Sequence, residues 1–445
     1  MLKNETVKII TGSNFAQEKH FILSVFVEDF LGMHLDMEFL VEKTGYELIY
    51  QSNCVQLNDV FFGDNYFNDK THQNLKSFNL KGNELPAWFY DVNTELDIKV
   101  DIFGMAFFIM SGYADIHFSQ NDEFERNIGY SSFLVQKQLI DRPIIQEWFT
   151  VLACELLQLS ETDFLSNRLY SKHVSHDVDQ PFEYLNYTYR RLLKRLIGDV
   201  VIRRDFNLAI ERVKFFHKVK GGDFESDPYN NFEELIDLLA AFDIRSAFFF
   251  VASDNDHPND VNYQIHQKPI KQIVKKVHNA GHKIGIHPSF NTLGCSDKLS
   301  EEVKALNTVL NELQIKSLVN ESRKHYLRWD WKTTPKELSD AGIEHDYTVG
   351  YADRTGFRAG VAFPYSAFDW INKKILPIKI HPLIVMECSL LNEGYMGVSY
   401  KEASEIIGTY HTILKKLGGE FVFLWHNHLL IDKKDIQLFN YFLGL

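Results

Sequence analysis

The chain has 445 residues, which suggests two or three domains and allows a sizeable hydrophobic core. Its formal net charge of -13 argues against nucleic acid or an anionic membrane surface as a partner, because both attract clustered Lys and Arg. A hydrophobic content of 45%, with 36 Phe and 20 Tyr, argues against a disordered chain.

The cysteines and the apolar runs indicate the compartment. Cys54, Cys154, Cys295 and Cys388 lie far apart without a C-x-x-C spacing, so neither a disulfide framework nor a structural zinc knuckle is predicted. The first residues lack the pattern of a secretory signal, and no apolar run reaches the roughly 18 residues that a membrane-spanning helix needs. We therefore expect a cytoplasmic protein without a membrane span. The sequence leaves the oligomeric state open.

Residues 1–165 give a mixed α/β pattern. VKIITG, MEFLVEK and YELIYQ read as strands, while AQEKHFILSVFVEDFLGM, the apolar stretch from 96 to 117 and RPIIQEWFTVLACELLQL read as helices. We predict a small α/β domain that folds alone and serves as a scaffold, a partner-binding surface or a substrate-delivery module. Asp97, Asp101 and His117 are expected to be solvated or capping groups.

Residues 166–445 change to a steady alternation of short strands and helices. Such an alternation predicts a parallel sheet with crossover helices, and about seven units predict a closed or nearly closed β/α barrel. The active site of such a barrel lies at the carboxyl ends of its strands. Polar residues occur at these predicted ends: Asp177, Asp179, His287, His426 and Asn427.

The segment His173 to Gln180 reads as a strand that runs into two carboxylates. Side chains alternate along a strand, so Asp177 and Asp179 project the same way with Cα atoms roughly 6 to 7 Å apart. Two carboxylates this close repel unless a cation, a proton or an Arg lies between them, which suggests chemistry. The alternative is a strand end whose Asp179 caps the following helix.

Three stretches carry a family resemblance. HDVD, RSAFFFVA (245–252) and GHKIGIHPSFN (281–291) are similar to motifs of the NodB-like polysaccharide deacetylases, carbohydrate esterase family four. The resemblance covers about residues 170 to 430 and implies a distorted (β/α) barrel of the NodB type. It implies Asp177 as general base, with Asp179 and His287 as ligands of a divalent metal, zinc first. With its added N-terminal domain, the chain resembles a bacterial subgroup of these proteins.

One position departs from the family pattern. The family has a second His four residues after the first, and this chain has Asn291 there. We predict Asn291 as a metal ligand through its amide oxygen, which binds zinc more weakly than imidazole does, with His325 as the alternative. His282 is expected to be structural.

Two further residues complete the predicted site. In the family's third motif an Arg orients the catalytic Asp, and the segment 322–348 points to Arg328, with Arg323 and Arg358 as alternatives. EFVFLWHN resembles the last motif, which implies His426 as the general acid. His428 and Asn427 are second choices.

These observations predict a metal-dependent hydrolase that removes N-acetyl or O-acetyl groups from a carbohydrate. Four aromatic residues are candidates for stacking on sugar rings: Trp329, Trp331, Tyr365 and Trp370. The first alternative is a catalytically weak or inactive barrel that binds a sugar or a partner protein. The second takes HDVD as the D-x-D motif of a nucleotide-sugar glycosyltransferase, which leaves HPSFN and LWHN unexplained.

Overall fold

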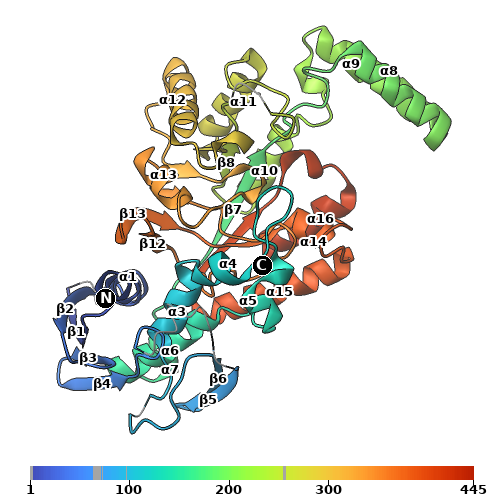
Figure 1. The fold of residues 1–445 in the computed structure, drawn as a ribbon. Coiled ribbons are helices and arrows are strands. Elements are labelled where there is room, and N and C mark those ends of the chain that lie inside the picture. Colours follow the sequence, from blue (N-terminus) through green and yellow to red (C-terminus); the bar gives the residue numbers. More distant parts are fainter. Residues whose placement is uncertain (1–3, 64–71, 73, 97, 254–256) are drawn as a thin grey trace. The chain divides into compact units, whose positions relative to one another are not determined.

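The structure is a computed structural model that describes residues 4–63, 72, 74–96, 98–253 and 257–445 (Figure 1). The prediction for Asp97 lies outside these residues. The fold is mixed α/β, and the chain divides into two compact units, each formed by three chain segments. Unit 1 comprises Met1–Lys172, Tyr326–Ser399 and Glu405–Phe423; unit 2 comprises His173–His325, Tyr400–Ser404 and Leu424–Leu445.

Unit 1 begins with a four-stranded sheet in the order β2-β1-β3-β4. Its strands are β1 (Thr6–Gly12), β2 (His34–Leu40), β3 (Tyr46–Tyr50) and β4 (Asn53–Leu57). Strand β1 runs parallel to β2 and antiparallel to β3. Helix α1 (Ala16–Ser24) continues as the π-helical turn η1 (Val25–Phe30), and together they form the connection that a parallel β1–β2 pair requires. The predicted strands and the helix between them are confirmed.

The next part of unit 1 is mostly helical. Its elements are β5 (Lys76–Leu80), β6 (Asn83–Ala87), α3 (Ile102–Met110), α4 (Tyr113–Phe118), η2 (Gly129–Ser131), α5 (Phe133–Gln136), α6 (Ile144–Leu157) and α7 (Glu161–Leu165). All residues of α3 are buried, as its sequence IFGMAFFIM requires. Asp101 caps α3 by accepting a hydrogen bond from the Gly104 N–H at 2.7 Å, which confirms its predicted capping role.

Residues before 165 share a core with residues after 326. The ring of Phe21 packs on Phe368 with centroids 5.1 Å apart, and the Tyr365 hydroxyl donates to the Met110 carbonyl at 3.2 Å. Both pairs belong to unit 1. The domain boundary near 165 stays a prediction, but this packing leads us to expect that residues 1–165 do not fold alone.

The later part of unit 1 differs from a uniform parallel barrel. Strand β11 (His345–Asp346) is parallel to β13 (Lys374–Ile380), whereas β12 (Tyr365–Asp369) is antiparallel to β13. The sequence pattern did not predict β12. The remaining elements in this part of the chain are η6 (His325–Leu327), α13 (Thr334–Asp340), β14 (Leu383–Met386), α14 (Glu387–Leu391), α15 (Tyr400–Leu417) and β15 (Gly419–Leu424). Barrel closure stays a prediction.

Unit 2 contains the predicted alternation of parallel strands and helices. Its neighbouring strands are β10 (Glu321–Ser322), β9 (Lys283–Ile286), β8 (Ala247–Phe250) and β7 (Tyr170–Val178), and they pair in parallel. The connecting helices are η4 (Phe224–Ser226), α10 (Phe232–Ala241), α11 (Lys268–Asn279), η5 (Phe290–Thr292) and α12 (Ser296–Glu312). Since AFFF in β8 is wholly buried, this strand has the two covered faces typical of a parallel sheet.

The end of the chain joins unit 2 beside β7. The Trp425 N–H donates to the Ser175 carbonyl at 3.0 Å, and the His176 Nδ1–H donates to the Trp425 carbonyl at 2.8 Å. These bonds fix the chain just after β15 against β7, the strand that carries HDVD. The chain then continues as η7 (Asn427–Leu429) and α16 (Lys433–Gly444). The sequence order alone would leave β7 and the chain after β15 far apart.

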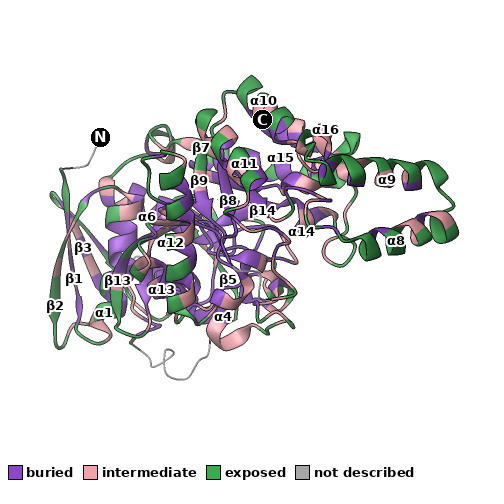
Figure 2. Ribbon diagram, turned by 90° about the horizontal axis from the view of Figure 1, so that it is seen from above, coloured by how far each residue is buried: buried purple, intermediate pink, exposed green. Residues whose placement is uncertain are grey.

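A helical hairpin extends between β7 and β8, and we call residues 189–220 the basic hairpin. It contains α8 (Tyr189–Ile197), the π-helical turn η3 (Gly198–Arg203) and α9 (Phe206–Lys220). At one end, Leu192 of α8 and Phe216 and Val219 of α9 pack with Tyr184 and Tyr187 in a small buried cluster. Figure 2 shows that most of the hairpin's outer surface is exposed. Among the helices that the structure describes, none is both long and apolar enough to cross a membrane.

Candidate metal centre and active site

The two carboxylates of HDVD lie at the carboxyl end of β7. Asp177 is paired with Phe249 in the β7–β8 register and is only 2% exposed. Its Oδ1 lies 3.0 Å from Nη1 of Arg323, which is itself fully buried. The guanidinium of Arg323 lies over the ring of Phe249, 4.9 Å from the centroid. Asp177 is therefore held in one orientation, with its negative charge compensated.

Asp179 lies within reach of two imidazoles. Its Oδ1 is 3.3 Å from Nε2 of His287 and 3.6 Å from Nε2 of His325. The three ligand atoms lie within 4.8 Å of one another. Ligands bound to one tetrahedral ion at 2.0 to 2.1 Å are separated by about 3.3 to 3.4 Å, so these distances are close to those of a zinc site.

The tautomer of His287 also suits a metal ligand. Its Nδ1 is hydrogen-bonded to the backbone carbonyl of Arg323. A carbonyl only accepts hydrogen bonds, so Nδ1 carries the proton and Nε2 presents its lone pair toward Asp179. An imidazole whose second nitrogen donates to a carbonyl is the usual support of a metal-bound His.

A buried oxygen without a donor gives an independent test of fit. Oδ1 of Asp179 is buried and accepts no hydrogen bond from the residues that the structure describes. Burying a carboxylate oxygen in this way costs free energy unless another group compensates it. One carboxylate oxygen and two imidazole nitrogens form a donor set that zinc accepts. Asp179, His287 and His325 thus fit a divalent cation.

In the metal-free protein the imidazole of His325 holds a proton, which it must release before it can bind a metal ion. Burial would lower the pKa of its imidazole, but Asp179 and Asp260 raise it to about 9. In return, although burial opposes the charged form, the positive charge of His325 lowers the pKa of Asp179 well below its ordinary value. The His325 Nδ1 lies 3.6 Å from Oδ1 of Asp260. The backbone N–H of His325 donates to the Pro288 carbonyl at 3.1 Å, which fixes this residue beside the HPSFN loop.

His426 reaches the same cluster from the other side of β7. Its Nε2 lies 3.5 Å from Oδ2 of Asp179, and its side chain is 12% exposed. The neighbouring Asn427 donates from Nδ2 to the Gln180 carbonyl at 3.1 Å, which secures the turn that follows β15. The structure thus brings Asp177, Asp179, His287 and His426 close together, and their roles stay predictions.

The loop after His287 is held by a buried carboxylate. Glu302 of α12 accepts a hydrogen bond from the Ser289 N–H at 2.9 Å and a second from the Ser289 hydroxyl. Burial raises the pKa of Glu302 to about 7. Asn291 lies in η5 of this loop. Its predicted role as a ligand stays a prediction, whereas His325, the alternative, is the residue found in the cluster with Asp179.

Of the three candidate arginines, Arg323 is the one found in contact with Asp177. Its backbone N–H donates to the Ile286 carbonyl, which places it at the end of the sheet beside His287. Arg328, our first choice, belongs to unit 1, where its Nε donates to the Phe124 carbonyl at 2.8 Å. The residues before it, Tyr326 and Leu327, have φ values of 61° and 55°, so a sharp turn separates Arg328 from β10. The sequence prediction of Arg328 relied on its distance from the following helix, and that distance gives no sign of the turn.

The remaining predicted residues have structural roles. Arg358 binds Asp115, and His282 accepts a hydrogen bond from the Ser246 N–H at 3.1 Å. Trp331, Trp329 and Tyr365 are buried in unit 1, and the Trp370 indole donates to the Ser111 carbonyl at 2.8 Å. Side chains packed in this way are core and anchoring groups of unit 1, and their contacts are with protein.

Two site residues were missed by the sequence analysis. Asp260 follows a stretch without strand or helix pattern, and its Oδ1 accepts from the Phe290 N–H at 2.8 Å. Glu302 lies on the buried face of an otherwise charged helix. In the sequence, only the position of Glu302 among Leu299, Val303 and Leu306 indicated that its side chain is buried. A carboxylate on the apolar face of a helix needs a hydrogen-bond or ion-pair partner.

Comparison with known proteins finds one family for part of the chain. Residues 7–161 match a family described as "Family of unknown function (DUF7033)". No curated protein matches the chain.

Three solved structures illustrate the structural likeness. One is a protein assigned as a polysaccharide deacetylase from Mycobacterium smegmatis, at 16% identity and a TM-score of 0.39, covering 62% of this chain and 83% of that chain. Another is the peptidoglycan N-acetylglucosamine deacetylase Bc1960, at 14% identity and a TM-score of 0.29, covering 62% and 89%. A third is PuuE allantoinase, at 10% identity and a TM-score of 0.36, covering 62% and 84%. At these scores the likeness assigns neither fold nor activity.

Proposed function

We propose that this protein is a metal-dependent hydrolase that removes N-acetyl, or O-acetyl, groups from a carbohydrate. The observation that carries the proposal is the convergence of Asp177, Asp179, His287, His325 and His426 at the end of β7. Two carboxylates and three imidazoles provide both a ligand set and separate groups for proton transfer. The resemblance of HDVD, HPSFN and LWHN to deacetylase motifs gives the substrate class.

Each residue has a distinct task in the proposed reaction. Asp179, His287 and His325 hold the divalent ion, zinc first. The bound ion supplies Lewis acidity to the site. Asp177 accepts the proton of the water that attacks the acetyl carbonyl, and Arg323 orients this carboxylate. His426 donates a proton to the departing amine or hydroxyl of the sugar.

The two carboxylates can be separated experimentally. Asp177→Asn is expected to retain zinc binding in isothermal titration while acetate release from an N-acetylglucosamine oligomer falls about a hundredfold. Asp179→Ala is expected to lose both zinc binding and turnover. Wild-type turnover in Asp177→Asn would remove the base assignment.

The third ligand is tested by a matched pair of substitutions. We expect His325→Ala to weaken zinc binding strongly and Asn291→Ala to leave it nearly unchanged, because His325 lies in the cluster with Asp179. The reverse result would return the third position to Asn291. In that case Asn291→His, which restores the H-x-x-x-H spacing, should tighten binding.

A binding module without turnover is the alternative that these measurements address. Zinc binding by the wild type, together with sugar binding but no acetate release from N- or O-acetylated sugars, would favour that alternative. A cytoplasmic location also remains a prediction of the sequence.

A further inference from the structure

The basic hairpin has a charge opposite to that of the whole chain. Residues 189–220 contain ten Lys or Arg and three Asp or Glu, a net charge of +7, whereas the whole chain carries -13. The remaining 413 residues are correspondingly acidic, because the total includes the hairpin. The net charge of the chain therefore hides a strongly cationic segment, and the argument against an anionic partner does not apply to this part of the molecule.

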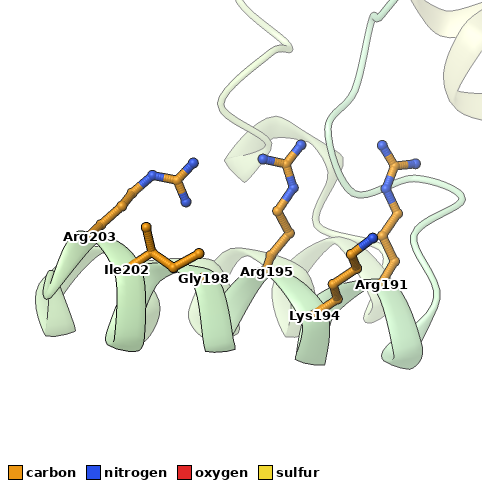
Figure 3. A pocket seen from close by; sticks show the side chains of 6 residues that line it. All are labelled: Arg191, Lys194, Arg195, Gly198, Ile202 and Arg203. Atoms are coloured by element: carbon orange, nitrogen blue, oxygen red, sulfur yellow. The ribbon is translucent and has the colours of Figure 1, made fainter.

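The cationic side chains form a row on one side of the hairpin. Figure 3 shows Arg191, Lys194, Arg195 and Arg203 extending to the same side of the helix, around the space left by Gly198. Arg191, Lys194 and Arg195 form no ion pair with any residue that the structure describes. By contrast, Arg203 binds Asp199 at 2.7 Å. The guanidinium of Arg191 lies over the ring of Tyr187, 4.6 Å from its centroid, so the row offers an external partner one stacked and two unstacked cationic side chains without an ion pair among the described residues.

Large apolar side chains are exposed on the same hairpin. Leu193 and Ile197 of α8 are 60% and 55% exposed, and Ile202 near the turn is 82% exposed. Phe206 and Ile210 of α9 are 64% and 66% exposed and line an apolar groove with Leu196 and Val200. A monomer in water gains nothing from so many exposed apolar groups on one projecting segment, so they indicate a surface that is covered in use.

We propose that the basic hairpin docks on an anionic membrane surface. Its exposed apolar side chains enter the boundary between headgroups and acyl chains, and its Arg and Lys side chains extend to the lipid phosphates. Ile202 lies within the cationic row, whereas Leu193, Ile197 and Phe206 lie outside it. A basic helical segment that also exposes aliphatic and aromatic residues is typical of this kind of binding. Charge complementarity with anionic headgroups accounts for the row, and burial in lipid accounts for the apolar residues.

Other occupants explain only part of these observations. A symmetric contact between two copies would bring two hairpins of charge +7 together, which is repulsive. Nucleic acid would neutralise the cationic row but would leave Leu193, Ile202 and Phe206 exposed.

The hairpin is rooted beside the candidate active site. It follows Asp179 along the chain, and the turn before it is fixed by hydrogen bonds from Glu183 and Tyr184 N–H groups to Asp227 at 2.8 and 2.9 Å. Asn427, next to His426, donates to both Gln180 and Tyr229 carbonyls at 3.1 Å. Docking through the hairpin would therefore bring the edge of unit 2 that carries Asp179 and His426 to the lipid surface.

The test is co-sedimentation of the full-length protein with phosphatidylcholine vesicles, with and without phosphatidylglycerol. We expect binding to the anionic vesicles that weakens in high salt. The double variant Arg191→Glu with Arg195→Glu should weaken it at least about thirtyfold, because each basic residue near the surface contributes about fivefold. Ile202→Ser with Phe206→Ser should weaken binding to the anionic vesicles as well, by removing the apolar contact.

The matched control places the same charge change elsewhere in unit 2. Lys268 and Lys275 of α11 are exposed, and Lys268→Glu with Lys275→Glu should bind anionic vesicles like the wild type. An equal loss in this control would overturn the proposal, since general charge attraction would then explain binding. Absence of binding by the wild type would also overturn it. A dimer that Ile202→Ser with Phe206→Ser dissociates, without vesicle binding, would assign the surface to a second copy.

Discussion

Each unit contains a buried carboxylate surrounded by cationic or aromatic groups, but the two clusters are completed differently. In unit 1, Oδ1 of Asp115 accepts from the Tyr351 and Ser119 hydroxyls at 2.8 and 2.9 Å. Its Oδ2 accepts from the Trp331 indole at 3.1 Å and from Arg358 at 2.8 and 2.9 Å. In unit 2, Asp179 has three imidazoles nearby, and its buried Oδ1 accepts no hydrogen bond from the described residues.

The difference distinguishes a structural carboxylate from one that we propose to bind a metal ion. Both carboxylate oxygens of Asp115 accept hydrogen bonds from protein groups, and a buried charge needs such partners if the fold is to be stable. Around Asp179 the neighbours are nitrogen atoms at 3.3 to 3.6 Å, a separation that suits a shared ion better than direct hydrogen bonds. Burial and charge alone do not distinguish the two clusters; the completeness of hydrogen bonding does.

The largest effect is expected from cutting the chain after residue 165. Trp331, Tyr351 and Arg358 all lie beyond the cut, so Asp115 would lose three of its partners and Phe21 would lose Phe368. We expect the fragment 1–165 to show no cooperative thermal unfolding by circular dichroism. A cooperative melt would support the predicted independent domain.

The next largest effect is expected from replacing Asp115 or Asp179 by the neutral Asn. Asp115→Asn leaves the Arg358 guanidinium buried without its counter-charge and should lower the free energy of unfolding by about 3 to 5 kcal/mol. Asp179→Asn should have a much smaller effect on the metal-free protein and should abolish zinc binding. Urea unfolding without metal, together with calorimetric zinc titration, measures both. Equal destabilisation by the two substitutions would remove the distinction between the clusters.

Glu302 is an intermediate case, because it is hydrogen-bonded by Ser289 and its pKa is nevertheless raised to about 7 by burial. The folded protein therefore holds a proton that the unfolded chain releases near pH 4.5. The stabilisation from this group is complete below about pH 4.5 and is lost as the pH rises to about 7, up to about 3 kcal/mol.

Glu302→Gln should remove this pH dependence, because a Gln side chain stays neutral while it can still accept from the Ser289 N–H. Urea unfolding of the metal-free protein between about pH 5 and pH 8 compares the two proteins. An unchanged slope in Glu302→Gln would assign the pH dependence to other groups.

The smallest expected effect is that of replacing Arg323, and it tests which arginine orients Asp177. Arg323→Ala should lower turnover about tenfold, since it removes the group that orients Asp177, and should leave zinc affinity nearly unchanged. Arg328→Ala is the matched control, and it should retain turnover because Arg328 bonds to Phe124 and Glu125 in unit 1. Loss of turnover in Arg328→Ala alone would support Arg328, as the sequence predicted, as the residue that orients Asp177.

The sequence predicted the elements well because their signals are local. The runs at β1, β7, β8 and β9 and the helices α3, α6, α10 and α11 follow hydrophobic patterns that neighbouring residues determine. The proximity of Asp177, Asp179, His287 and His426 could also be predicted, because each lies at the end of a recognisable strand or just after it. These predictions needed no information about distant contacts.

The rest depended on contacts that no local pattern records. The orientation of Asp177 by Arg323 follows from the turn at Tyr326 and Leu327, and His325 reaches Asp179 only because its backbone bonds to Pro288. The shared core of unit 1 joins residues more than 300 positions apart, such as Phe21 and Phe368. The sequence of β12 has no pattern that would show that this strand runs antiparallel to β13.

The three-segment composition of unit 2 has a consequence for the order of folding. His176 and Trp425, whose hydrogen bond brings His426 to Asp179, are separated by 249 positions in the chain. Contacts between nearer segments, such as β7 with β8, close much shorter loops and are less costly in entropy. The sheet that carries Asp177, Asp179 and His287 can therefore form before His426 is brought beside it, so these three residues would be in place before the proposed proton donor.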